Sequence, residues 1–383
     1  MKGFAERVNV IEEYYFSQKL KEVKKLQMEG KPIINMGIGS PDLPPHPSVV
    51  EALCDTARDS NSHGYQNYQG IPELRKSFSD FYLKYYHVHL SHLDEILPLI
   101  GSKEGILHVS MTFMDEGDHV LIPDPGYPTY SSVSKMLGLK PIYYRLRKEN
   151  NWYPDFEELE NFDLSKVKLM WVNYPHMPTG AKADLDLFER LVNFAKKHDI
   201  LLVNDNPYSF ILEDTPKSIF QVEGAKEIAI ELNSLSKTAN MAGWRVGCVT
   251  GNSENIKAIT KVKSNVDSGM FLGIQNAAIA ALNLDRDWYN SLNQVYGLRR
   301  ELLWKFAEKL NLEFSIDTVG MFIWAKLPNG INCRDYVDKL LYEKNIFVTP
   351  GDIFGKQGEG WVRLSLCVKN EEIEAAIKRL EFL

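Results

Sequence analysis

Short apolar runs alternate with longer stretches of helical periodicity through the middle of the chain. Polar residues, glycine or proline bound each apolar run, which is typical of buried strands. The strands expected from this pattern lie at 119–124, 167–175, 200–205, 227–232 and 247–251. Helical patterns occupy about 103–115, 126–138, 184–198 and 253–264. The alternation predicts an α/β fold with a mostly parallel central sheet that is sandwiched by helices.

The two ends of the chain depart from this alternation. The first 44 residues begin with a helical pattern and reach "PIINMGIGSPDLPPHP", which is too rich in proline and glycine for a central strand. After about residue 280, long helical patterns accompany short strands such as "FIWAKL" and "WVRLSL". We therefore expect a large domain at 45–279 and a smaller α/β domain made from 1–44 together with 280–383.

Polar residues follow three of the expected strands at the point where each strand ends. Asn173 comes after "LMWV", Asp205 after "LLVN" and Ser234 after "AIELN". Binding sites of such sheets form at the carboxyl edge of the strands. These three side chains are therefore the first indication of a functional site.

Composition excludes several classes of protein. Hydrophobic residues make up 44% of the 383 residues and charged residues 25%, which is typical of a globular chain. The formal net charge of −7 gives no electrostatic reason to expect a nucleic-acid partner. The four cysteines are scattered, which favours reduced thiols in a cytoplasm over disulfides or a zinc site, and we predict no metal site. No apolar run approaches the ~20 residues of a membrane helix.

One lysine stands within a serine-containing stretch, "NSLSKTANMAGWRVG", at 233–247. A lysine that is partly desolvated, or that has cationic neighbours, can form a Schiff base with an aldehyde. Arg245 follows Lys237 by eight residues and could supply that charge while holding a phosphate. Ser234 and Ser236 could donate hydrogen bonds to the same phosphate. For this stretch alone, a solvated loop with two unrelated cations is the alternative interpretation.

The stretch from Ser234 to Gly247 resembles, position by position, the cofactor-lysine signature of class I and II aminotransferases. These enzymes have fold type I and use pyridoxal 5′-phosphate (PLP), so the resemblance implies that fold and that cofactor. Lys237 matches the lysine that holds PLP, and Arg245 and Ser234 match residues at its phosphate. Other motifs of the family follow in the family's order over nearly the whole chain.

Two of these motifs concern the phosphate and the ring of the cofactor. In "GSKEGILHV" (101–109), a glycine-containing turn at a helix start exposes N–H groups, and the helix dipole adds positive potential. The resemblance places Ser102 and Lys103 at the phosphate; a capped helix without a ligand is the alternative. In "PDPGYPTY" (123–130), Tyr127 matches the aromatic residue that stacks on the pyridine ring.

The motif "NDNPYSF" (204–210) resembles the D-x-x-Y element of the family. Asp205 would pair with the pyridine nitrogen and keep it protonated, which makes the ring an electron sink. Tyr208 would donate a hydrogen bond to the ring hydroxyl oxygen. An aspartate that caps a helix after a strand is the alternative for Asp205.

The motif "NYPHMPTG" (173–180) departs from the family, whose usual form ends in N-P-T-G. That asparagine donates to the ring hydroxyl oxygen, and Met177 stands in its place here. A thioether is no hydrogen-bond donor. We therefore expect Tyr208 to serve this oxygen, with Asn173 near the cofactor and covering part of the loss.

Three further residues complete the resemblance. "GYQNYQGIPELR" (64–75) places Tyr65 where the family has a tyrosine that reaches the phosphate of a partner subunit. The resemblance thus implies a homodimer with shared active sites. "WVRLSL" places Arg363 at the position of the arginine that binds the substrate carboxylate. Gly39 in "GIGSPD" would bring a backbone N–H to the same carboxylate.

The sequence therefore predicts an aminotransferase with ping-pong kinetics, in which Lys237, Asp205 and Tyr208 are the catalytic group. "GIGSPDLPP" and "IGSKEGI" resemble a subgroup that includes aspartate, alanine and LL-diaminopimelate aminotransferases. We expect an L-amino acid of these kinds as donor and a 2-oxo acid such as 2-oxoglutarate as acceptor. Contacts to the substrate side chain could come from Tyr14, Tyr15 and Phe16, or from segment 264–271 of a partner.

Two alternatives remain open at this point. A PLP-dependent C–S β-lyase shares the same scaffold and the same cofactor lysine. A non-catalytic binding protein with this fold is a different class altogether, although the presence of Lys237, Asp205 and Arg363 disfavours it.

Overall fold

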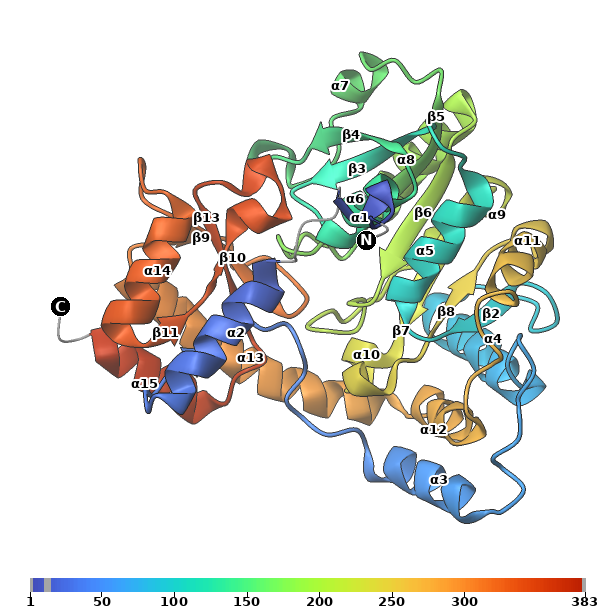
Figure 1. Cartoon of the computed structure of the whole chain (residues 1–383), viewed down its shortest axis with the longest axis horizontal. Helices are drawn as coiled ribbons and strands as arrows, with labels where there is room; N and C mark the ends of the chain where they lie inside the picture. Colours follow the sequence, from blue (N-terminus) through green and yellow to red (C-terminus); the bar gives the residue numbers. More distant parts are fainter. Residues whose placement is uncertain (1–2, 10–14, 381–383) are drawn as a thin grey trace.

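The computed structural model of the chain describes residues 3–9 and 15–380, and Figure 1 shows two α/β parts side by side. A long helix, α13 (Arg286–Lys309), runs between them. The larger part is built on a seven-stranded sheet in the order β2-β8-β7-β6-β5-β3-β4. Its strands are β2 (Ile96–Leu99), β3 (His119–Asp124), β4 (Lys140–Arg145), β5 (Val167–Val172), β6 (Leu201–Asn206), β7 (Ala229–Ser234) and β8 (Gly247–Thr250).

The sheet is mostly parallel, as predicted, because neighbouring strands from β4 through β3, β5 and β6 to β7 all pair in parallel. Strand β8 is the exception, since it pairs antiparallel with both β7 and β2. The pattern did not indicate β2 or β4. Strand β2 has four residues, and β4 is a half-exposed edge strand without a continuous apolar run.

Helices cover both faces of this sheet. Leu169 and Trp171 pack with residues of α5 (Ser102–Phe113), α6 (Pro128–Met136) and α11 (Ser253–Lys263). Met170 and Val172, which alternate with them along β5, pack in a second core. That core contains residues of α4 (Pro72–Tyr86), α8 (Leu185–His198) and α12 (Leu272–Leu282), and α3 (Pro47–Arg58) packs on α12. The alternation is that of a strand that is buried on both faces.

Helix α8 shows how local sequence defines these elements. Asp184 accepts a hydrogen bond from the Asp186 N–H at the first turn, and Asp199 ends the helix in a left-handed conformation with φ of 53°. Leu187, Phe188 and Leu191 are buried on one face, at the spacing of an amphipathic helix.

The smaller part has an antiparallel sheet in the order β12-β13-β10-β9. Its strands are β9 (Glu313–Phe314), β10 (Phe322–Lys326), β12 (Thr349–Pro350) and β13 (Trp361–Ser365). A parallel pair, β1 (Ile34–Asn35) with β11 (Ile346–Phe347), joins the two ends of the chain. The helices of this part are α2 (Tyr15–Met28), α14 (Cys333–Lys344) and α15 (Asn370–Leu380). The remaining short helices are α1 (Glu6–Asn9), α7 (Phe156–Glu160), α9 (Ala225–Ile228) and α10 (Leu235–Thr238).

A third apolar core belongs to the smaller part and contains residues from both chain ends, such as Ile34 and Leu364. We propose the division at 45–279 against 1–44 and 280–383 on this basis. Met177 and Tyr208, which come from the larger part, also pack in that core. The two parts therefore meet beside the carboxyl ends of β5 and β6.

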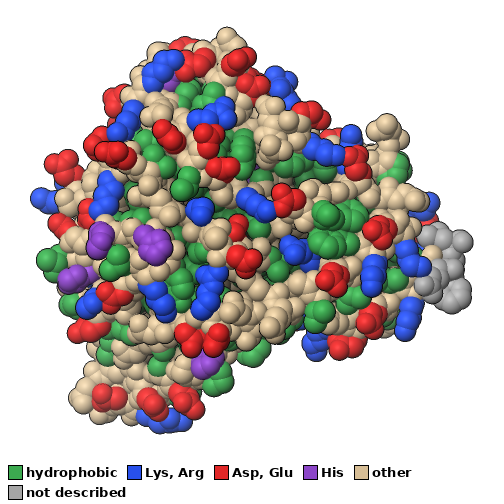
Figure 2. Space-filling model, turned by 180° about the vertical axis from the view of Figure 1, so that it is seen from behind, with side chains coloured by type: hydrophobic (Ala, Val, Ile, Leu, Met, Phe, Trp, Pro, Cys, Tyr) green, Lys and Arg blue, Asp and Glu red, His purple; other side chains and the backbone are tan. Residues whose placement is uncertain are grey.

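The surface carries charges of both signs. Figure 2 shows acidic and basic side chains interspersed over the rear face, so the net charge of −7 is not gathered there. Within residues 3–9 and 15–380, no helix has the length and apolar character needed to cross a membrane.

Candidate active site

The residues predicted to hold cofactor and substrate meet in one cavity of about 480 Å³. It lies where β5, β6 and β7 end, at the first turn of α5 and against β13. The predicted residues that line it are Gly39, Ser102, Lys103, Tyr127, Asn173, Asp205, Tyr208, Ser234, Lys237, Arg245 and Arg363. The ends of the parallel strands bring Asn173, Asp205 and Ser234 together, as the sequence indicated.

Lys237 reaches the cavity from α10, directly after β7. Its Nζ donates a hydrogen bond to the backbone oxygen of Gly39. Burial, together with the smaller effect of the charges of Arg363 and Arg245, lowers the pKa of this amine to about 8. A larger fraction of the amine is therefore neutral near pH 7 than for an ordinary lysine, which suits attack on an aldehyde.

Asp205 lies near the end of β6 with 4% of its surface exposed. Its Oδ2 accepts a hydrogen bond of 2.9 Å from the Tyr130 hydroxyl. Oδ1 is buried and has no hydrogen-bond partner in the part of the chain that the structure describes. Burial raises the pKa of the carboxyl to about 7. A cationic group that donated a hydrogen bond to Oδ1 would favour the ionised carboxylate and give this oxygen a partner.

The first turn of α5, together with the side chains of Lys103 and Arg245, forms a basic site that we call the basic cup. Gly101 precedes it with φ of +80°, and a side chain there would collide with the guanidinium of Arg245. Arg245 donates from Nη1 to the backbone oxygen of Ala242 at 2.7 Å, and the hydroxyl of Ser236 lies 3.4 Å away. Burial and then the charge of Arg245 lower the pKa of Lys103. Two cations thus lie beside the N-terminus of a helix, which is a site for an anion.

Arg363 lies on β13 and is buried, with 4% of its surface exposed. Its Nη2 donates to the Gly37 oxygen at 2.9 Å, and its guanidinium lies 4.0 Å from the centre of the Phe322 ring. A Cβ at Gly39 would lie 2.6 Å from the same ring, so only glycine fits there. The arginine is therefore held rigidly beside the Gly39 backbone, which suits a carboxylate ligand.

Met177 fills the place where the family has asparagine. Its Sδ lies 3.5 Å from Nη1 of Arg363. Asn173 supports this loop through two hydrogen bonds to the backbone. Its Oδ1 accepts from the Met177 N–H at 2.9 Å, and its amide nitrogen donates to the backbone oxygen of Asp205. The oxygen and one amide hydrogen of Asn173 are thus engaged by the backbone. This leaves Asn173 one amide hydrogen to offer a ligand.

The sequence interpretation omitted Tyr130 as a site residue. Tyr130 lies three residues after Tyr127 on α6, and its ring stacks on Trp171 with centroids 4.9 Å apart. The motif "PDPGYPTY" contains it, so the i, i+3 spacing was the available signal. Leu20, Ile38 and Phe322 also line the cavity and were not predicted.

Of the remaining predicted residues, some lie outside this cavity. Tyr65 is 94% exposed and is not part of the cavity. Phe16 lines the cavity, whereas Tyr15 lines a second one, and Tyr14 lies outside the described residues.

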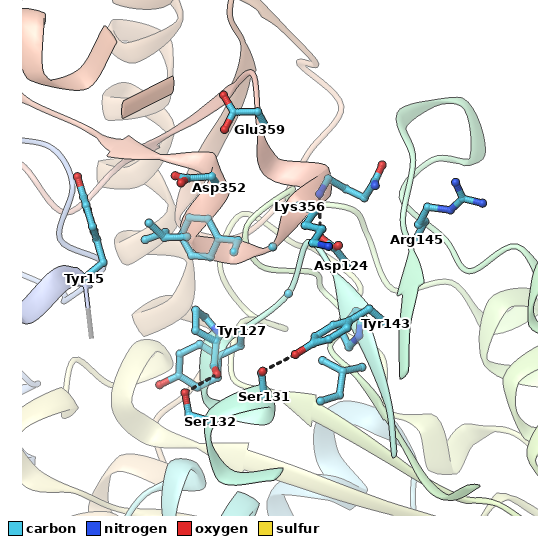
Figure 3. A pocket seen from close by; sticks show the side chains of 18 of the residues that line it. Tyr15, Asp124, Tyr127, Ser131, Ser132, Tyr143, Arg145, Asp352, Lys356 and Glu359 are labelled. Carbon is cyan, nitrogen blue, oxygen red and sulfur yellow. Dashed lines mark hydrogen bonds between the residues drawn. The ribbon is translucent and has the colours of Figure 1, made fainter. Parts of the chain in front are cut away.

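The second cavity, of about 1290 Å³, adjoins the first at Tyr127, which lines both. Figure 3 shows Asp352, Lys356 and Glu359 of the smaller part on one side of it and Tyr143 and Arg145 of the larger part on the other. Tyr127 thus separates the site from a cavity that residues of both parts line.

The donor set fits PLP. A buried carboxylate with an unpartnered oxygen suits the pyridinium, a lysine of lowered pKa suits the aldehyde, and the basic cup suits the phosphate. An α/β fold with a site of this kind is that of the fold type I transferases.

Comparisons with known proteins agree with this fold type. A family model described as "Aminotransferase class I and II" matches residues 31–380. The chain is 41% identical to an LL-diaminopimelate aminotransferase of Dehalococcoides mccartyi, over 98% of this chain and 97% of that protein. It is 38% identical to one of Aquifex aeolicus, over 99% of both chains. The solved structure of apo-BacF from Bacillus subtilis has a TM-score of 0.96 and 35% identity, covering 100% of this chain and 98% of that one.

The chain therefore belongs to the class I and II aminotransferase family, and it is an aminotransferase. A double mutant of Thermus thermophilus aspartate aminotransferase, 25% identical over all of both chains, has a TM-score of 0.93. This family is PLP-dependent in general, and neither alternative to an aminotransferase is favoured.

Proposed function

We propose that this aminotransferase binds PLP in the cavity around Lys237 and moves an amino group from an L-amino acid to a 2-oxo acid. The observation that carries the proposal is the buried Oδ1 of Asp205, which has no partner within the described chain and lies in the same cavity as Lys237. An ionised carboxylate at that place requires a cation, and the pyridinium of PLP is one. When bound, PLP supplies a ring that withdraws electrons from the α-carbon of the substrate.

Each residue has a role in this proposal. Lys237 would hold the cofactor through its aldehyde, and its amine would move the proton at the α-carbon of the substrate. Asp205 keeps the ring nitrogen protonated, and Tyr208 donates to the ring hydroxyl oxygen. Arg363, with the Gly39 N–H, binds the substrate carboxylate and orients the bond to be broken. Tyr127 stacks on the ring, and the residues that hold the phosphate are Ser102, Lys103, Ser234 and Arg245.

For the donor we propose LL-diaminopimelate, with 2-oxoglutarate as acceptor. The support is the name of relatives that are 38–41% identical over nearly the whole chain. The part of the lining that serves neither cofactor nor carboxylate is largely apolar, at Phe16, Leu20, Ile38 and Phe322. Such a wall suits the three methylene groups of that donor.

A panel of amino donors with 2-oxoglutarate tests this assignment. Glutamate formation should give the highest kcat/KM with LL-diaminopimelate, above L-aspartate, L-alanine and L-phenylalanine. A tenfold preference for any other donor would overturn the choice of donor and leave the reaction class intact. Pyruvate released from cystathionine without an acceptor would instead indicate the β-lyase.

We also propose a homodimer with shared sites, in which Tyr65 reaches the phosphate of the partner subunit. Exposed apolar side chains gather on two loops, at Tyr65, Tyr68, Val266 and Phe271. The segments are neighbours, because a Cβ at Gly269 would lie 2.7 Å from the Gln66 oxygen. Light scattering should give twice the chain mass of 43.9 kDa. The cytoplasmic location expected from the cysteine pattern stays a prediction.

The rate of PLP capture by the apoprotein should rise with pH through a midpoint near 8, where burial places the pKa of Lys237. Only the neutral amine attacks the aldehyde, so the rate should increase about 15-fold from pH 6.5 to pH 8. Stopped-flow absorbance would measure it, with a free lysine side-chain analogue as control. A midpoint near 10 would show that Lys237 is solvated like that control.

Replacing Met177 with asparagine should lower the midpoint of the pH-dependent absorbance change of bound PLP by about one unit. The added amide N–H would donate to the ring hydroxyl oxygen in its ionised form. Met177→Leu lacks a donor and should leave the midpoint unchanged. The same midpoint in both variants would mean that Tyr208 and Asn173 already satisfy this oxygen.

A further inference from the structure

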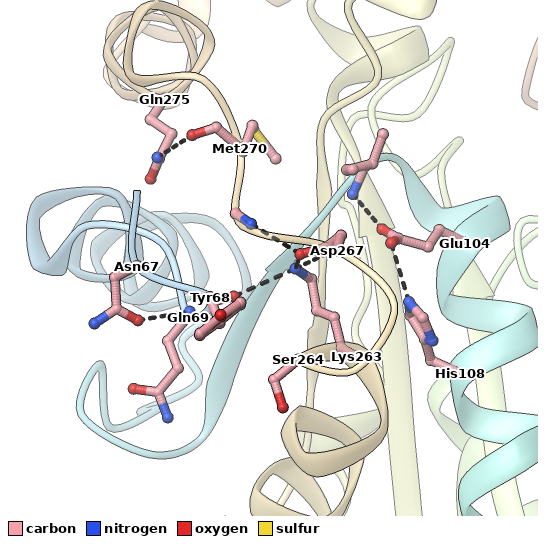
Figure 4. A network of polar contacts seen from close by, with 12 residues as sticks. Asn67, Tyr68, Gln69, Glu104, His108, Lys263, Ser264, Asp267, Met270 and Gln275 are labelled. Carbon is pink, nitrogen blue, oxygen red and sulfur yellow. Dashed lines mark hydrogen bonds and ion pairs between the residues drawn. The ribbon is translucent and has the colours of Figure 1, made fainter. Parts of the chain in front are cut away.

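A buried ion pair lies behind the exposed loop that carries Tyr65. Figure 4 shows Lys263, at the end of α11, pointing toward Asp267 and the Tyr68 backbone. Lys263 Nζ lies 2.7 and 2.8 Å from the two carboxylate oxygens of Asp267 and donates to the Tyr68 oxygen at 3.3 Å. The side chains of Lys263 and Asp267 are 3% and 14% exposed. All three ammonium hydrogens thus have a neighbouring acceptor, although the pair lies beside a surface loop.

The same pair adjoins the basic cup of its own subunit. Glu104, His108 and Asp267 offer ligand atoms within 4.8 Å of one another, and the Lys263 ammonium supplies the positive charge of this group. Glu104 accepts from the Ile100 N–H at 2.5 Å and lies 3.0 Å from Nε2 of His108. Glu104 and His108, both on α5, therefore place the Lys263–Asp267 pair against the larger part.

The two loops touch closely at a second place. The Tyr65 loop (residues 64–70) and the Val266 segment (residues 264–271) are joined by Gln275, which is fully buried. Gln275 accepts from the Ile71 N–H at 2.8 Å and donates to the Met270 oxygen at 2.7 Å. Gln275 fixes the C-terminal ends of both loops. Lys263 adds a hydrogen bond to the Tyr65 loop at Tyr68, close to where Gly269 packs against Gln66.

We propose that Lys263 and Asp267 form a positioning clamp that holds Tyr65 in place for the active site of the partner subunit. This inference rests on the shared-site dimer proposed above. A buried cation that is fully occupied by a carboxylate and one loop oxygen has a defined geometry, because any displacement leaves a buried charge unpaired. The clamp acts through Tyr65 and touches neither cofactor nor substrate, so both residues are positioning residues.

Replacing Lys263 with methionine should raise the dissociation constant of PLP at least tenfold in the homodimer. Methionine keeps much of the length of the side chain and removes the charge. Equilibrium dialysis of apoprotein with PLP measures the affinity directly, without reference to turnover. Lys263→Arg should restore most of the affinity. The matched control is Lys76→Met, which removes an exposed i, i+4 pair with Asp80 of the same length, 2.7 Å, and should change nothing.

Two mixed dimers, isolated with different affinity tags, separate a positioning role from general damage. In the first, a Lys237→Ala subunit is paired with a Lys263→Met subunit. The one site that keeps Lys237 then receives Tyr65 from a subunit whose clamp is intact. In the second, a subunit with both changes is paired with an unaltered subunit. Its one working site receives Tyr65 from a subunit whose clamp is broken.

Borohydride reduction at a subsaturating PLP concentration measures the amount of PLP bound at the working site. This amount should be close to that of an unaltered site in the first mixed dimer and at least fivefold lower in the second. Both dimers contain one Lys263→Met chain, so a folding defect would affect them equally. Equal values in the two dimers would overturn the clamp. Tyr65→Phe in place of Lys263→Met tests the shared site itself. If that change has no effect in the second dimer, the proposed dimer is wrong; if it weakens binding and Lys263→Met does not, only the clamp is wrong.

Discussion

Replacing Lys237 with alanine should abolish amino transfer, with turnover lowered by at least about 10⁴-fold, because one amine both attaches the cofactor and moves the proton. The amine lies in the same cavity as Asp205 and Arg363, and burial lowers its pKa to about 8. PLP should still bind through the basic cup at Ser102 and Arg245. Glutamate formation measures the activity, and equilibrium dialysis measures the remaining affinity.

The control for this result is Lys237→Arg, which keeps the positive charge and cannot attach to the aldehyde at neutral pH. It should be as inactive as the alanine variant. In the unaltered protein, borohydride reduction followed by peptide mapping should fix PLP on the peptide that contains Lys237. Label on Lys103 instead, or transamination retained by the alanine variant, would show that the assigned lysine is wrong.

Replacing Asp205 with asparagine should lower turnover by at least about 10²- to 10³-fold, the size found when one preorganised electrostatic group is removed. A neutral amide cannot keep the ring nitrogen protonated, so the ring would withdraw electrons less strongly. The Tyr130 hydroxyl, 2.9 Å from Oδ2, would still find an oxygen acceptor on asparagine. Near-normal turnover with asparagine would mean that another group protonates the ring.

The same substitution should stabilise the apoprotein at alkaline pH. Burial raises the pKa of Asp205 from 3.8 to about 7, so between these values the folded chain keeps a proton that the unfolded chain has lost. The free energy of unfolding therefore falls as pH rises from about 4 to 7, by at most about 4 kcal/mol. Asparagine does not ionise, so Asp205→Asn removes this fall in the free energy of unfolding. Calorimetry should show a higher Tm for Asp205→Asn than for the unaltered apoprotein at pH 8, and a smaller difference at pH 4.

When PLP is added at pH 8, the unaltered protein should have a higher Tm than Asp205→Asn. The pyridinium supplies the cation that Oδ1 lacks, so at pH 8 the cofactor should stabilise the unaltered protein more than the asparagine variant. A difference in Tm that is the same at pH 4 and pH 8 would show that Asp205 is not the group whose ionisation limits stability.

Local sequence predicted the elements that carry the site. The apolar runs before Asn173, Asp205 and Ser234 are strands, and parallel neighbours end at one edge, so their polar residues meet. Motif spacing predicted Lys237 and Arg245 on one short segment, and the structure brings both to the cavity. These predictions hold because each depends on periodicity or on a few consecutive residues.

Other features depend on contacts between distant segments, which one sequence does not reveal. The hydrogen bond from Tyr130 to Asp205 joins residues 75 positions apart, and the Lys263 contact to Tyr68 joins residues 195 apart. The edge strand β4 lacks a continuous apolar run because one side of it is exposed. The direction of β8 is set by its partners β7 and β2.

The sequence by itself predicted most strands and helices around the site, the family and Lys237 as the candidate cofactor lysine, since those predictions follow from residue type and spacing. Only the tertiary structure decided how the site is tuned. Three features result from burial: a carboxylate oxygen of Asp205 that has no partner among the described residues, an amine of lowered pKa, and a buried ion pair beneath an exposed loop. Burial is a property of the packed chain, because it depends on which distant residues exclude water from a group.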